Sequence, residues 1–180
     1  MKTFDKVSGK ECGTVSVGIK SSDCGLWNDR WLIEKYNSRE DYNAGNAYET
    51  SEIVKGNLLL VTGINEIWNL VAGASANVFN EANSLIGVGS TDTAAVDSQT
   101  DLLAASDKTY KAMSSGYPTV GTNEKIVFRA VFGEADANYN WREFVIKHDV
   151  SDICLNRLVS NQGTKASGQV WTVTLEISLS

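Results

Sequence analysis

The sequence predicts a mainly β protein, an antiparallel β-sandwich with one short α-helix packed against it. Three observations favour this fold class. The segment from Trp171 to Ser180 alternates apolar and polar residues without a break, as a strand with one buried face does. A single segment places its apolar residues at helical spacing. Many glycine, asparagine and serine residues punctuate the remainder as turns, whereas proline occurs once, at Pro118.

The chain of 180 residues is expected to form one β-rich domain, 1–180, because no proline-rich or charged linker interrupts it. A chain of this length buries roughly 70% of its unfolded surface and so builds a substantial core. Residues 1–30 are expected to form an N-terminal arm or extra strands. Three apolar residues in that stretch alternate with small ones: Val15, Val17 and Ile19. The polar segment Ser38–Lys55 is expected to be a loop or an arm.

Short strands and one helix are predicted next along the chain. Trp31–Tyr36 forms a strand, and Leu58–Val61 is a brief apolar run. The helix lies in Gly63–Gly73, and Gly73 is a natural stop just past its end. Its apolar residues recur at i, i+3, i+4 and i+7, which makes one stripe: Ile64, Ile67, Trp68 and Val71. Ser90–Leu102 is predicted to contain one further turn of helix.

The second half of the chain carries the strongest strand patterns. In Ile126–Phe132 both faces are mostly apolar, which predicts a central strand covered on two sides. Trp141–Lys147 and Asp152–Val159 are predicted to pair as a hairpin, with the polar segment His148–Asp152 as the turn. Trp171–Ser180 has one apolar and one polar face, as is typical of antiparallel sheets with one wet side.

Charge and hydropathy exclude two classes of partner. A net charge of −6 and the absence of a basic run disfavour nucleic acid. No stretch approaches the roughly 20 apolar residues that a membrane-spanning helix needs. The N-terminus has no apolar core of a secretory signal, so the protein is expected to be made in the cytosol. The cysteines fit no metal pattern and are interpreted as reduced thiols, with a Cys12–Cys24 bridge as the alternative: Cys12, Cys24 and Cys154.

Catalytic motifs are not recognisable, so the sequence predicts no enzyme and no cofactor. His148 is the one histidine, and no nucleophile motif accompanies it. It is interpreted as a surface residue of a turn. The glycines in Gly87-Val-Gly89 and at Gly116 do not open a helix as phosphate-binding loops do, and are interpreted as turns.

A calcium site is the one metal site that the sequence suggests. Glu134, Asp136 and Asn138 stand at i, i+2 and i+4, which is how a calcium loop begins. The pattern is incomplete, because no glycine occupies the sixth position and Val145 stands where the loop's glutamate would be. The favoured interpretation is a polar loop whose side chains cap their own backbone.

Aromatic residues gather in the first third of the chain. Such residues anchor protein interfaces or stack on sugars, and an interface is the favoured interpretation because buried aromatic anchors are typical of obligate interfaces. Core positions are the alternative. Trp68 and Trp141 are further residues that belong either to a contact or to the core. The candidate interface residues are Trp27, Trp31, Tyr36, Tyr42 and Tyr48.

Several short blocks resemble, in order and spacing, a group of structural proteins of tailed-bacteriophage virions. The resemblance covers Trp31 to Ser180. Members of this group are variously described as head decoration, tail or fibre proteins. The blocks are Gly56–Leu60, Ile86–Ala95, Gln99–Leu102, Tyr110–Met113, Gly116–Pro118, Phe128–Gly133, Ala135–Glu143, Leu155–Arg157 and Gly163–Thr174.

This resemblance implies a non-enzymatic virion protein, above all a capsid decoration (cement) protein that braces neighbouring capsid subunits. The implied partners are the major capsid protein or other virion proteins, and further copies of the chain in a homo-oligomer. Its implied location is the virion, after assembly in the host cytoplasm. The alternatives are a tail, collar or fibre-attachment protein, and a carbohydrate-binding module for host attachment.

Overall fold

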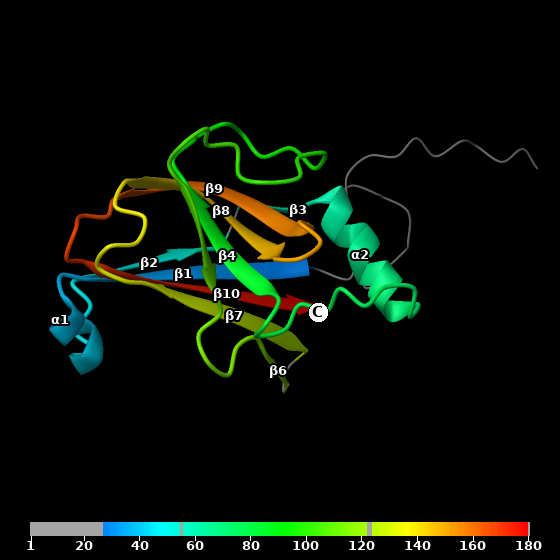
Figure 1. Ribbon diagram of the computed structural model, residues 1–180, viewed down its shortest axis with the longest axis horizontal. Helices are drawn as coiled ribbons and strands as arrows, with labels where there is room; N and C mark the ends of the chain where they lie inside the picture. Colours follow the sequence, from blue (N-terminus) through cyan, green and yellow to red (C-terminus); the bar gives the residue numbers. More distant parts are fainter. Residues whose placement is uncertain (1–26, 55, 122–123, 180) are drawn as a thin grey trace, which may run out of the picture.

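The computed structural model describes residues 27–54, 56–121 and 124–179. Two five-stranded antiparallel sheets pack face to face as a sandwich (Figure 1). Sheet A contains, in spatial order, β2 (Glu49–Ile53), β1 (Trp27–Tyr36), β10 (Val170–Leu179), β7 (Lys125–Phe132) and β6 (Thr119–Gly121). Sheet B contains β3 (Asn57–Leu59), β9 (Cys154–Thr164), β8 (Asn140–His148), β4 (Ser84–Gly89) and β5 (Lys108–Ala112).

The predicted fold class is therefore confirmed. The strands predicted in the second half of the chain are present as β7, β8, β9 and β10, and β8 pairs with β9 as the expected hairpin. Strand β1 is longer than expected and begins at Trp27. The prediction for Val15, Val17 and Ile19 lies outside the described residues.

Two short helices lie at opposite ends of the sandwich (Figure 1). Helix α2 (Val61–Val71) is the predicted one, whereas α1 (Arg39–Ala44) was not expected. The prediction of a loop or arm for Ser38–Lys55 is wrong, because this segment forms α1 and β2. The Ser38 hydroxyl accepts a hydrogen bond from the Asp41 N–H at 3.1 Å, and Gly45 ends the helix at φ 72°.

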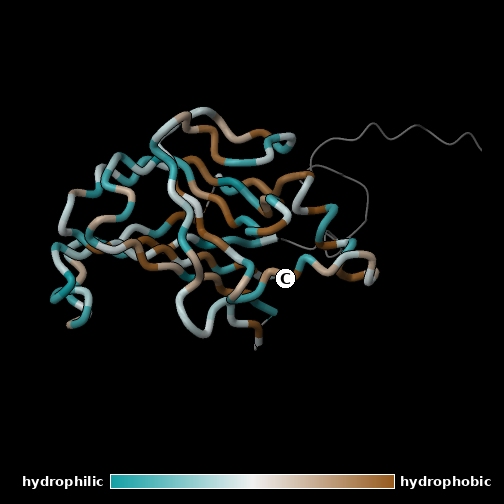
Figure 2. The backbone as a smooth tube through the Cα atoms, viewed as in Figure 1, coloured by the Kyte–Doolittle hydropathy of each residue, from teal (hydrophilic) through white to brown (hydrophobic). Residues whose placement is uncertain are grey.

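The core between the sheets is built around aromatic rings. Trp141 of β8 is fully buried and contacts Phe132 and Trp171 of sheet A, each with ring centroids 4.8 Å apart. Its indole N–H donates to the Ala137 carbonyl at 2.8 Å, so its one polar group is satisfied. Figure 2 shows hydrophobic stretches along the strands and a largely hydrophilic α1. The rings thus join the two layers.

The outer face of sheet A is polar. Arg30 pairs with Glu52 at 2.9 Å and Lys125 pairs with Glu176 at 2.7 Å. On β7 the inward residues from Phe128 onward are buried, whereas Val127, Arg129 and Val131 are partly exposed. The prediction that Ile126–Phe132 is covered on two sides is therefore wrong, because its outer side chains stay partly exposed. Helix α1 packs on this face only near the end of β1, where Tyr42 contacts Tyr36.

Sheet B, by contrast, is covered on both faces. The long loop between β4 and β5 lies over its outer side (Figure 1). An ion pair buried on that side joins Arg157 Nη2 to Glu143 Oε2 at 2.8 Å, with both side chains fully buried. The Glu143 carboxylate also accepts from the backbone N–H groups of Leu103 at 2.9 Å and Ala104 at 2.8 Å.

The same pair fixes the beginning of the loop. Arg157 donates to the Gln99 side chain at 2.9 Å and to the Thr93 carbonyl at 3.0 Å. Because these interactions hold the loop extended across the sheet, Ser90–Leu102 contains no helix. The predicted helical turn is therefore wrong.

Strand β4 passes beneath this loop, and its glycines make room for side chains above them. A Cβ at Gly89 would lie 2.3 Å from Glu143 Oε1. A Cβ at Gly87 would lie 2.8 Å from the Tyr110 ring. The interpretation of Gly87-Val-Gly89 as a turn is therefore wrong: both glycines belong to a strand in which larger residues would displace the buried pair or the tyrosine.

Replacing Arg157 with methionine should lower the free energy of unfolding by about 3–5 kcal/mol, because it leaves the Glu143 charge buried without its partner. Arg30→Met is the matched control at an exposed pair, and should cost much less, because solvent screens both charges. Urea unfolding followed by tryptophan fluorescence measures both values. Equal losses in the two variants would contradict the anchoring role of the buried pair.

Candidate docking surface on helix α2

Helix α2 approaches strand β9 through its smallest residue. A Cβ at Gly63 would lie 2.2 Å from the Leu155 carbonyl oxygen, so glycine is what permits this close contact. The Thr62 hydroxyl donates to the Cys154 carbonyl at 3.0 Å. The N–H of Leu60, the residue before the helix, donates to the Leu155 carbonyl at 3.1 Å. The first turn is thereby fixed to sheet B.

The inward side of α2 also carries a buried carboxylate. Glu66 is 4% exposed. It accepts hydrogen bonds from the Ser75 hydroxyl and, at 3.4 Å, from the Asn69 side chain. Ser75 lies just beyond the helix, so Glu66 ties the chain that leaves α2 back to the helix. The side of α2 that faces the sandwich thus carries Gly63 and Glu66.

The apolar stripe of α2 faces outward instead. Val71 is 73% exposed, Trp68 64%, Val61 44% and Ile64 36%. Of the predicted stripe only Ile67 is partly buried and packs against the core. The helix does pack on the sandwich as predicted, but mainly through its other side. A contiguous apolar helix face in contact with water is uncommon on a folded protein and makes this face a candidate contact surface.

An apolar groove of about 620 Å³ adjoins this helix face. The core is open to solvent here, at the end of the sandwich that carries α2. The groove is floored by inward residues of both sheets and walled by α2 and the segment after it. Its lining includes Ile67, Leu70, Phe79, Val120, Phe128 and Ile177. The sequence predicted neither the groove nor that the apolar stripe of α2 faces solvent.

The structure separates the five aromatic residues that the sequence suggests as an interface. Trp31 is fully buried and Tyr36 is 4% exposed, so both belong to the core and are not available to a partner in this fold. Tyr42 is half-buried and packs edge-on against Tyr36, with ring centroids 5.3 Å apart. Tyr48 is exposed at the α1 end. Trp27 lies at the opposite end and lines the groove.

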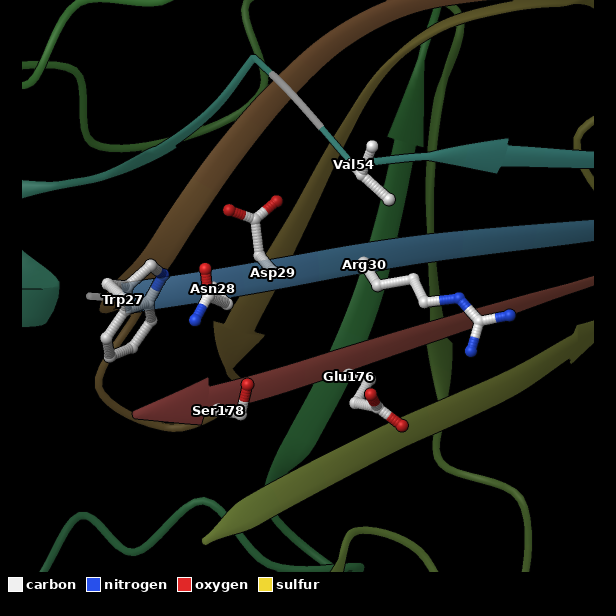
Figure 3. A pocket seen from close by; sticks show the side chains of 7 residues that line it. All are labelled: Trp27, Asn28, Asp29, Arg30, Val54, Glu176 and Ser178. Atoms are coloured by element: carbon white, nitrogen blue, oxygen red, sulfur yellow. The ribbon is translucent and has the colours of Figure 1, made fainter. Parts of the chain in front are cut away.

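A second, smaller depression of about 280 Å³ lies where β1 begins and β10 ends (Figure 3). Its carboxylates, Asp29 and Glu176, point away from each other because they project from opposite faces of sheet A. Burial raises the pKa of Asp29, against a hydrogen bond with Asn57 that lowers it. The two acids are therefore not placed as a general acid and base pair.

The candidate calcium residues lie in the loop between β7 and β8, where Asp136 is held by a lysine. Its carboxylate accepts from Lys111 Nζ at 2.6 Å and from the Gly133 N–H at 2.8 Å. Burial acts to raise the pKa of Asp136, but these hydrogen bonds outweigh it and lower the pKa. Glu134 is exposed and contributes its backbone carbonyl, which accepts from the Asn138 side chain at 3.0 Å.

The ammonium of a second lysine, which follows β9 in the chain, binds to this loop. Lys165 is fully buried and its ammonium donates to the Gly133 carbonyl at 2.7 Å and to Asn138 Oδ1 at 2.8 Å. The loop's oxygens thus already surround a positive charge. Among the described residues no group of three or more His, Cys, Asp or Glu side chains is arranged to hold a metal ion.

His148 is buried, 2% exposed, so its interpretation as a surface residue is wrong. Its ring packs edge-on against Phe79, with centroids 5.6 Å apart. Nδ1 accepts from the Ser151 N–H at 3.2 Å and lies 3.0 Å from the Ser151 hydroxyl. Both contacts fold the turn that joins β8 to β9.

In the part of the chain that is described, no helix has the length and apolarity to cross a membrane.

Comparison with protein-family models, curated proteins and solved structures found no significant match. The class of the protein is therefore defined by the fold itself, an antiparallel β-sandwich with an outward-facing apolar helix.

The buried ammonium of Lys165 should be visible in the pH dependence of stability. Burial lowers the pKa of Lys165 to about 8, although Asp136 and Glu134 act to raise it. Between pH 8 and the ordinary lysine value of 10.5, the unfolded chain binds more protons than the native one, so this group makes stability rise with pH.

Lys165→Met removes this titration. The free energy of unfolding of the native sequence minus that of the variant should grow by about 1–3 kcal/mol from pH 7.5 to pH 10.5. Urea unfolding of both proteins at several pH values measures the difference, in which other titrating groups cancel. A difference that stays constant with pH would refute the assignment.

Proposed function

We propose that this protein is a non-enzymatic structural component of a bacteriophage virion that docks on a partner protein through the outward face of α2. The observation that carries the proposal is the exposure of Trp68 and Val71, at 64% and 73%, in the C-terminal half of α2. Tryptophan is the residue most often found at the centre of protein interfaces.

The charge distribution suits such a contact. The whole chain carries a net charge of −6, which keeps free copies soluble and apart. Helix α2 contains one charged residue, Glu66, and that residue is buried. A partner that approaches the outer face of α2 therefore meets no charge on the helix, and the core of a stable interface is likewise depleted of charge.

Within this class we favour a capsid decoration protein, on the basis of the ordered sequence blocks that resemble virion proteins. Its mechanism would be burial of the α2 face against the major capsid protein, which braces neighbouring subunits. A tail, collar or fibre-attachment protein would use the same face at far lower copy number. A carbohydrate-binding role would instead use Trp68 to stack on a sugar ring.

Introducing Trp68→Ser and Val71→Ser together into the phage genome should remove the protein from purified particles, because burial of these side chains drives docking. The matched control is Tyr42→Ser with Tyr48→Ser, at the α1 end. It tests the aromatic cluster that the sequence suggests, and should leave the protein on the particle. Quantitative mass spectrometry of the particles gives the copy number for each genome.

Circular dichroism of the purified proteins checks that both double variants fold. Hundreds of copies per particle would favour decoration, and a few would favour a tail part. Retention of the α2 variant together with loss of the tyrosine variant would overturn the proposal. Binding of the native protein to a glycan array, lost in Trp68→Ser, would favour the carbohydrate alternative.

A further inference from the structure

The loop between β4 and β5 reaches the beginning of α2 and adds an exposed apolar residue there (Figure 1). The N–H of Val61, the first residue of the helix, donates to the Asp97 carbonyl at 2.9 Å. Val61 is 44% exposed and Val96, the neighbour of Asp97 in the chain, is 49% exposed. Exposed apolar residues therefore occur on both segments that meet at the first turn of α2.

This part of the loop is held in place by the side chain of Gln99. Its oxygen Oε1 accepts from the Val96 N–H at 2.9 Å and from Arg157 Nη1 at 2.9 Å. Its nitrogen Nε2 donates to the Ala94 carbonyl at 3.0 Å. Because Arg157 belongs to the buried ion pair, Val96 and Asp97 are fixed before any partner arrives, which lowers the entropic cost of docking.

The Asp97 carboxylate is an exposed charge at the border of this apolar surface. Two other acids of the same loop have cationic partners, since Asp92 pairs with Arg142 at 2.7 Å and Asp101 pairs with Lys147 at 3.1 Å. Asp97, by contrast, forms no ion pair with any residue that the structure describes. Its charge is therefore free to pair with a cation of another molecule.

The surroundings of the first turn of α2 are acidic as a whole. The turn is hydrogen-bonded to the carbonyl of Cys154, whose thiol lies 3.8 Å from Asp101 Oδ1. Lys147 is shared between Asp101 at 3.1 Å and Asp152 at 3.0 Å. Together with Asp97, three carboxylates thus accompany this one ammonium. A surface that faces them gains from positive charge and loses from negative charge.

We propose that the partner surface that receives the outward face of α2 carries lysine or arginine side chains at its rim, and that one of them pairs with Asp97. This inference rests on the proposed function, since it names the chemistry of the partner that docks on α2. Apolar contacts at the centre with charges at the rim are the usual anatomy of a protein interface. A second copy of the chain is disfavoured as the occupant, because each copy carries a net charge of −6.

Rebinding of Asp97→Asn to virus particles tests the inference. Asparagine keeps the backbone carbonyl that accepts the Val61 N–H and removes only the charge. Particles from the genome with Trp68→Ser and Val71→Ser, which lack the protein under the proposed function, are mixed with purified full-length protein. Quantitative mass spectrometry measures the bound protein in about 50 mM and about 500 mM NaCl, where charges are weakly and strongly screened.

The matched control is Asp92→Asn, which removes a carboxylate of the same loop that is 76% exposed and pairs with Arg142 of its own chain. In low salt Asp97→Asn should bind about two- to fivefold more weakly than the native protein. In high salt the two should bind alike, because ions screen the pair between the two rims. Asp92→Asn should match the native protein in both.

Native binding by Asp97→Asn in low salt, or tighter binding, would overturn the inference. A loss that is equally large in high salt would also overturn it, because the cause would then be structural and not the charge. Retention of the Trp68→Ser and Val71→Ser protein on particles would instead overturn the proposed function, and this inference with it. Loss of that protein together with native binding by Asp97→Asn would overturn this inference alone.

Discussion

The buried ion pair between Glu143 and Arg157 is the interaction on which the rest of the structure depends. It places two opposite charges, fully buried, on the outer face of sheet B, where removing either would leave the other unpaired. The pair fastens the loop between β4 and β5. That loop in turn provides the Asp97 carbonyl that accepts the Val61 N–H at 2.9 Å. The buried charges thus fix the beginning of α2.

These attachments determine which side of α2 packs on the sandwich and which side faces solvent. Leu60, immediately before the helix, is buried with Leu102 of the loop in a small apolar cluster. Gly63 then lies against Leu155, and the apolar stripe is left on the far side. The outer face of sheet A carries partly exposed ion pairs such as Lys125–Glu176, and α1 covers it only near the end of β1. Helix α2 therefore exposes an apolar surface that includes Trp68 and Val71.

The pattern of apolar residues was enough to predict part of β1 and the strands β7 to β10, but not β2, β5 or β6. It did not predict β4, since Gly87 and Gly89 resemble turn residues until Tyr110 and Glu143 are known to lie above them. These are contacts between distant parts of the chain. The helical turn expected in Ser90–Leu102 failed for the same reason, because Arg157 holds that segment extended.

The candidate site was harder to predict than the fold, because an apolar stripe at helical spacing does not say which side of the helix faces the protein. Gly63 was the available signal, since a glycine within a helix often marks close packing. Trp31 and Trp68 likewise look alike in sequence, although one is in the core and the other is 64% exposed.

Hydroxyl-radical footprinting measures whether the outer face of α2 is buried on the particle. Oxidation of Trp68 and Tyr48 would be compared by mass spectrometry in the free protein and in purified particles. If α2 is the docking surface, Trp68 should be oxidised in the free protein and at least fivefold less in particles, while Tyr48 changes little. Protection of Tyr48 with unchanged oxidation of Trp68 would contradict it.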